Sequence, residues 1–176
     1  MLYFRQKPIN GIFKEASMKR NIRIVLLGEL VILLAVFTVL ILLCNDPSGV
    51  IAYFFDLPSF LLLTVVLITG LLLTGMWKDF FKAFSVGIRR FSLLEIKNII
   101  QAVEAAQKLT AFGVLFVILT EGILVMGNLR DLEALGPNLG LIALSALYAV
   151  IIEFFLFPLK LNAQHKMNEE MDLGDD

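Results

Sequence analysis

Residues 57–77 read LPSFLLLTVVLITGLLLTGMW and contain no charged side chain. A helical run of about 20 apolar residues is long enough to cross the roughly 30 Å hydrocarbon core of a bilayer. Because that core has no water to bond backbone amides, a helix is the stable state of such a run. The stretch predicts a transmembrane helix and sets the class of the whole protein.

Three further runs have the same length and apolar character, each with one charged residue: 24–44, 109–129 and 137–159. The first is too long for the apolar part of a signal peptide, and the chain that follows it, from Cys44 to Pro47, lacks a small-x-small cleavage pattern. We therefore interpret it as a permanent helix. The sequence predicts an all-α membrane protein with four transmembrane helices.

The overall composition agrees with this class and excludes others. Hydrophobic residues make up 59% of the 176 residues and charged residues 18%, against roughly 25% charged in soluble domains. The net charge of −1 gives no basic field for nucleic acid. A single cysteine and a single histidine exclude disulfide frameworks and clustered metal ligands. No phosphate-binding loop or nucleophile–base motif is present, so we expect neither an enzyme nor a bound cofactor.

The lysines and arginines predict the orientation in the membrane. Fourteen of the fifteen lie in the N-terminal segment, in the loop after the second run or in the C-terminal tail, and one, Arg130, lies in the remaining loops. Because cytoplasmic loops are enriched in these residues, both termini and the middle loop are expected to be cytoplasmic.

The parts outside the membrane give the domain organisation. We expect an interfacial cytoplasmic segment over 1–20, a four-helix membrane domain over 21–165, and an acidic tail over 166–176 that frays. Apolar residues at helical spacing in the loop 78–108 predict helices over about 78–90 and 92–108, which extend the second and third spans into the cytoplasm. Ser92 is a plausible N-cap, and Glu95 three residues later completes a capping box.

Three carboxylates within the apolar runs are the first candidates for function, since a charge at mid-membrane costs roughly 2.5–3.5 kcal/mol on insertion scales. Glu121 lies deepest, about 20 Å along a helix from Lys108. Glu29 and Glu153 lie about 9–10 Å from the nearest cytoplasmic basic residue. A path of protonatable groups is one interpretation. The alternatives are pairing of Glu29 or Glu153 with Arg23 or Lys160, and a structural hydrogen bond of Glu121 at a subunit interface.

Several stretches resemble the MotA/TolQ/ExbB family of proton-channel subunits, most closely its MotA branch. They are LGPNLG at 135–140, IALSALYA at 142–149, FPLKL at 157–161, DLPSFL at 56–61 and KDFFKAF at 78–84. Pro158 stands at the family's terminal proline, and Ser145 at the first position of its usual Thr-Thr pair, whose second position is Ala146 here. The loop of about 31 residues is much shorter than in flagellar stators.

The resemblance implies an ion-driven motor or energiser in the bacterial inner membrane. In this family a homo-oligomeric ring, a pentamer, surrounds a single-span partner of the MotB/ExbD/TolR type that supplies the key protonatable Asp. Protons are favoured over sodium because the pore hydroxyls are depleted. Pro137 and Pro158 are expected to have structural or gating roles.

We therefore expect a channel or stator-like subunit that couples ion flow to mechanical work. The expected ion path comprises Thr120, Glu121, Ser145 and Tyr148 in the centre, with Glu29 and Glu153 near the cytoplasmic exit. Two alternatives stay open: a non-conducting membrane scaffold of the same fold, and a stand-alone small channel or transporter.

Overall fold

The structure is a computed structural model that describes residues 22–43, 54, 56–127 and 132–174. Five helices make up nearly all of this part of the chain, and it contains no β-strand. They are α2 (Ile22–Leu43), α4 (Leu57–Leu73), α5 (Trp77–Ala83), α6 (Leu93–Gly127) and α7 (Leu132–Gly174). The prediction of an all-α protein is confirmed.

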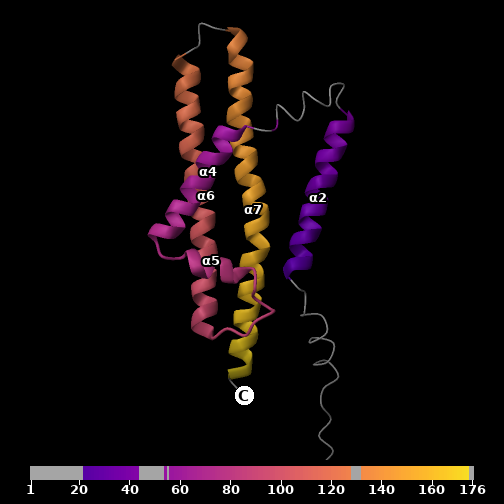
Figure 1. Ribbon diagram of the computed structural model, residues 1–176, viewed down its shortest axis with the longest axis vertical. Coiled ribbons are helices and arrows are strands. Elements are labelled where there is room, and N and C mark those ends of the chain that lie inside the picture. Colours follow the sequence, from indigo (N-terminus) through magenta and orange to yellow (C-terminus); the bar gives the residue numbers. More distant parts are fainter. Residues whose placement is uncertain (1–21, 44–53, 55, 128–131, 175–176) are drawn as a thin grey trace, which may run out of the picture.

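The longest helices, α6 and α7, run side by side as the spine of the molecule (Figure 1). With 35 and 43 residues they measure about 52 and 64 Å, well beyond the thickness of a membrane core. Their seam is closed by small and aliphatic side chains that are fully or almost fully buried, including Ile99, Val103, Ala106, Leu159 and Ala163. These buried side chains lie toward the end of the spine that projects past the apolar runs.

The N-terminus of α6 bears out the predicted capping box. The Ser92 amide donates to Glu95 Oε2 at 2.9 Å, and the Glu95 amide donates to Ser92 Oγ at 3.3 Å. These bonds satisfy backbone donors that a helix start leaves free. From Leu93 the helix continues without a break to Gly127, so the predicted continuation of the third span into the loop is confirmed.

The second predicted span is shorter than expected. Instead of running over 57–77, α4 ends at Leu73, and α5 leaves at an angle of 111°. Gly75 has φ +71, the Met76 amide bonds the carbonyl of Leu71 at 3.0 Å, and the Gly75 amide bonds that of Leu72 at 3.1 Å. This is a Schellman motif, which ends a helix at a glycine in the left-handed conformation.

The helix expected over 78–90 is also shorter, because α5 has only seven residues. After Ala83 the chain turns at Gly87, which has φ +90, and Val86 is fully buried beneath the turn. The loop helix is thus not an extension of the second span. It is a short segment folded across the end of α4.

The C-terminal helix is longer than predicted. The fourth run was expected over 137–159 with a frayed tail after it, but α7 continues through Gly174 with Pro137 and Pro158 inside it. Lys166 pairs with both Glu169 and Glu170 at 3.0 Å, one helical turn further on. Such pairs stabilise a helix surface, which explains why the acidic tail stays helical.

Helix α2 stands apart from the rest and contacts mainly α7 (Figure 1). Ile22 is its one buried residue, and most of its large apolar side chains are exposed. Exposure on this scale is unfavourable in water and favourable in lipid. Three described helices are long and apolar enough to cross a membrane, or up to four if α4 and α5 together form one span. The chain therefore has the character of a multi-pass membrane protein.

Candidate functional site

The start of α4 positions the first residue of the site. The Asp56 side chain caps the helix and accepts a hydrogen bond from the Ser59 amide at 3.3 Å. Pro58 occupies the first turn, where its missing N–H costs nothing. With the entry to α4 fixed in this way, Ser59 points inward and is only 6% exposed.

Glu121 is the centre of a three-helix cluster. Ser59 Oγ of α4 donates to Glu121 Oε1 at 2.8 Å, and Ser145 Oγ of α7 lies 3.0 Å from Oε1 and 3.1 Å from Oε2. Ser145 is fully buried and Glu121 itself is half-buried. One carboxyl group on α6 thus joins both neighbouring helices inside the apolar part of the bundle.

Ser145 has a second acceptor within reach. Its hydroxyl oxygen lies 3.1 Å from the carbonyl oxygen of Leu141, one turn earlier in α7. A hydroxyl has one proton to donate and two lone pairs to accept with. Ser145 can donate a hydrogen bond to an ionised Glu121, or it can donate to the Leu141 carbonyl and accept a hydrogen bond from a neutral Glu121. The cluster has a complete hydrogen-bond pattern in both protonation states.

A hollow of about 220 Å³ adjoins the carboxyl group, lined by Glu121, Leu124, Val125, Asn138 and Leu141. Its size admits several water molecules, and the Asn138 amide and the Glu121 carboxyl supply polar partners for them. Asn138 follows Pro137 directly, near the start of α7. The hollow lies between the last turns of α6 and the first turns of α7.

Tyr148 belongs to the wall of the site and is bonded to the backbone at the α4 entry. Its hydroxyl donates to the Phe54 carbonyl at 3.0 Å and accepts from the Asp56 amide at 2.7 Å. Its ring packs edge-on against Phe60 with centroids 5.8 Å apart. The hydroxyl has used its proton on a carbonyl, so the geometry gives Tyr148 the role of anchoring the entry to α4.

Thr120 does not join the cluster. It is exposed, and its hydroxyl bonds back to the Phe116 carbonyl of its own helix at 2.8 Å. Neighbouring residues on a helix point about 100° apart, so a residue beside Glu121 cannot share its direction. The structure therefore does not bring Thr120 together with Glu121, as the predicted central path would require.

Glu153 and Glu29 lie further along the bundle. Glu153 Oε2 accepts a hydrogen bond from Gln107 Nε2 at 2.9 Å. Lys160 instead forms a salt bridge with Glu104 at 3.0 Å, so the alternative pairing of Lys160 with Glu153 is not what the structure shows. Glu29 is half-buried, and its Oε2 has no hydrogen-bond partner among the described residues.

The two prolines differ in setting. Pro158 is buried in α7 beside Leu156 and Leu159, where its ring removes one backbone hydrogen bond of the helix. Pro137 is exposed near the start of α7. Neither proline contacts the carboxyl group of Glu121 through a hydrogen bond, since a proline has no N–H to donate.

Two participants were not predicted as site residues. The sequence offers a signal for Ser59, because it is a hydroxyl residue in the first turn of an apolar helix and follows the Asp-x-Pro sequence of residues 56–58. The sequence offers no signal for Gln107 beyond its polarity, because the helix expected over 92–108 was assigned to a cytoplasmic loop. Both were recognisable only once the packing of α4, α6 and α7 was known.

No protein-family model, curated protein or solved structure matches this chain. The cluster formed by Ser59, Glu121 and Ser145 is therefore the ground for a functional proposal.

Proposed function

We propose that this chain is a proton-translocating subunit of a membrane complex, and that Glu121 is the group that takes up and releases the proton. Carboxyl groups inside apolar spans are costly and commonly serve ion or proton pathways. Glu121 is half-buried among three helices and adjoins a hollow large enough to hold water. That combination of enclosure and access is what a proton carrier needs.

One observation carries the proposal, namely the choice of acceptor at Ser145. The serine lies within 3.1 Å of both the Glu121 carboxylate and the Leu141 carbonyl. Because its proton can turn from one acceptor to the other, Glu121 can gain or lose a proton without leaving a buried group unsatisfied. Unsatisfied buried polar groups cost about 1–3 kcal/mol, and this arrangement avoids that cost whether or not Glu121 carries a proton.

The rest of the path runs along α7. Glu153 lies eight residues after Ser145, about 12 Å along the helix axis. That distance exceeds a hydrogen bond, so water or a group from another chain has to bridge it. Glu29, with its buried unpartnered oxygen, is the second carboxyl on this side of the bundle. We propose that these two carboxyls receive the proton on the cytoplasmic side.

We propose four spans with both termini in the cytoplasm, a homo-oligomeric ring in a bacterial inner membrane, and a single-span partner of the kind that the MotA/TolQ/ExbB resemblance implies. Proton flow through such a complex would drive movement of the partner. The short α5 and its loop offer little surface for transmitting torque in the way flagellar stators do.

A non-conducting scaffold is the second candidate. The same cluster of Ser59, Glu121 and Ser145 supports it, because its hydrogen bonds also suit a structural role. Two serines hold the Glu121 carboxylate at 2.8 and 3.0 Å, which is also what a purely structural tie between helices would show. A scaffold would have the same fold and the same oligomer. It would differ in passing no protons.

Proton flux discriminates the two candidates. The complex would be extracted gently from its host, its copies and partner counted by native mass spectrometry, and the same sample placed in liposomes with a pH gradient. The proposal predicts several copies of this chain with a single-span partner, and flux above that of empty liposomes. An intact complex that leaves the gradient unchanged would instead establish the scaffold.

A further inference from the structure

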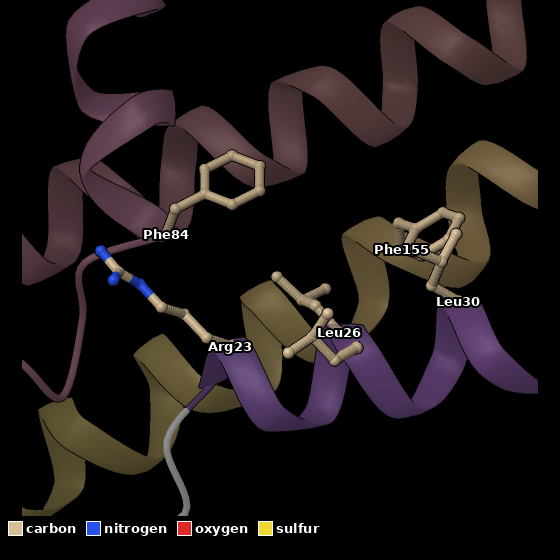
Figure 2. A pocket seen from close by; sticks show the side chains of 6 residues that line it. Arg23, Leu26, Leu30, Phe84 and Phe155 are labelled. Atoms are coloured by element: carbon tan, nitrogen blue, oxygen red, sulfur yellow. The ribbon is translucent and has the colours of Figure 1, made fainter.

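A second hollow lies far from Glu121, between the start of α2, the end of α5 and the middle of α7. It measures about 470 Å³ and is lined by Arg23, Leu26, Leu27, Leu30, Phe84 and Phe155. Figure 2 shows Arg23, Leu26 and Leu30 along α2, with Phe84 coming from the end of α5 and Phe155 from α7. The wall is almost wholly apolar, with a single cation at its mouth.

We infer that this groove binds one anionic phospholipid, with its phosphate at Arg23 and an acyl chain along Leu26, Leu27 and Leu30. The volume lies within the range of roughly 300–1,000 Å³ that ligand sites have. A guanidinium has five N–H donors in a planar fork, which suits a phosphate. Arg23 can therefore bind a phosphate alongside the contact it already makes within the chain.

The level of the groove in the membrane matches this ligand. Arg23 lies at the start of α2, and the following 20 residues contain one charged side chain. A lipid with its phosphate at Arg23 would therefore direct its acyl chain along the apolar part of α2. In the topology proposed above, this end faces the cytoplasm, where the leaflet attracts basic residues next to a span.

Helix α5 gives an independent indication of the same level. Its 111° bend away from α4 turns it across the bundle, with Phe81 and Phe84 exposed among Lys78 and Lys82. Exposed aromatic and basic side chains on one short helix are typical of a segment in the lipid headgroup region. Phe84, at the end of α5, forms part of the groove itself. The headgroup layer and the mouth of the groove thus coincide.

The test is lipid titration of the purified chain in detergent, followed by native mass spectrometry. Phosphatidylglycerol is the anionic probe and phosphatidylcholine the zwitterionic control. Wild-type protein should retain phosphatidylglycerol preferentially. Arg23→Gln should weaken that binding about fivefold, the factor expected for one basic residue at an anionic surface, and Arg23→Lys should keep most of it. Lys97→Gln, the same charge change at an exposed position on α6, should have no effect.

A groove-filling variant separates this site from general charge attraction. Leu30→Trp should lower retention of both lipids, whereas Val36→Trp, at another exposed position of α2 outside the groove, should not. Equal retention by wild type, Arg23→Gln and Leu30→Trp would overturn the inference. The inference would also be overturned if the wild type formed a lipid-free dimer and both Arg23→Gln and Leu30→Trp dissociated it. A second copy of the chain, and not a lipid, would then occupy the groove. This experiment does not measure proton flux, so it tests the lipid site independently of the proposed proton pathway.

Discussion

Ser145 of α7 donates its hydroxyl to the Glu121 carboxylate of α6 at 3.0 Å, and the two residues lie 24 positions apart on helices that run in opposite directions. Ser59 of α4 reaches the same carboxylate oxygen at 2.8 Å. Because one carboxyl group accepts from both neighbours, its protonation and the packing of three helices are linked. The stability of the bundle and any proton transfer at Glu121 therefore depend on the same bonds.

The two serines should contribute to stability non-additively. Ser145→Ala and Ser59→Ala should each lower the unfolding free energy in detergent by about 0.5–1.5 kcal/mol, as expected for one intramolecular hydrogen bond. With both removed, Glu121 loses its two donors, so the double variant should lose more than the sum. Thr120→Ala is the control, since its hydroxyl bonds only within α6. Losses no greater than those of Thr120→Ala would contradict the geometry.

Tyr148 should hold the start of α4 in place. Tyr148→Phe keeps the ring packing with Phe60 but removes the bonds to the Phe54 carbonyl and the Asp56 amide. The first turn of α4 should then exchange its amide hydrogens faster, while amides in the middle of α6 keep their wild-type rates. Hydrogen exchange read by mass spectrometry over residues 56–62 measures this. Unchanged protection there would show that the entry to α4 does not depend on the tyrosine.

Gly113 should be intolerant of larger residues because α4 crosses α6 there. A Cβ atom added at Gly113 would lie 3.3 Å from Val66 Cγ1 and 3.4 Å from a Leu63 methyl group. Gly113→Val would add two further methyl groups to this contact, and overpacking typically costs 1–3 kcal/mol. Gly122→Val is the matched control, because a Cβ at that position of the same helix meets nothing within 4 Å. Equal melting temperatures of the two variants would refute the close approach.

The cap of α6 should weaken in acid. The backbone amide of Ser92, and then its hydroxyl, hold the pKa of Glu95 below its ordinary value by hydrogen bonding to the charged carboxylate. With the pKa lowered in the folded state, the contribution is fully present above the ordinary glutamate range and is lost as the pH falls through the folded-state value. The protection factors of the first-turn amides of α6, which correct for the slower intrinsic exchange in acid, should therefore fall below about pH 4.5.

Glu95→Gln provides the comparison for that experiment. It cannot ionise, so its first-turn exchange should show no acid-dependent step beyond the intrinsic chemistry. A wild-type profile that parallels the Gln variant across the acid range would show that the carboxylate does not stabilise the cap.

Local signals in the sequence predicted a good part of this fold. Apolar runs of about 20 residues located α2 and the apolar parts of α6 and α7, because the length and hydropathy of such runs leave few alternatives. The Ser92–Glu95 box located the start of α6 because capping depends on residues three apart. The apolar run beginning at Leu57 located the start of α4.

The features that were missed depend on weak local signals or on packing. The amides of Gly75 and Met76 end α4 through two backbone bonds, but a glycine within an apolar run is equally common inside spans. The contact of Ser59 with Glu121 joins residues 62 positions apart, so no spacing rule could reveal it. Thr120 was expected in the ion path beside Glu121. Because neighbouring residues on a helix point about 100° apart, its side chain faces away from the Glu121 cluster.

Proton flux through Glu121 tests the central proposal most directly. Complexes carrying wild-type chain, Glu121→Gln or Glu104→Gln would be placed in liposomes with a pH gradient and a pH-sensitive dye inside. Glu104→Gln is the control, since Glu104 pairs with Lys160 on the projecting part of the spine. The proposal predicts wild-type flux for the Glu104 variant and the flux of empty liposomes for Glu121→Gln, with both complexes assembled. Wild-type flux through Glu121→Gln would contradict it.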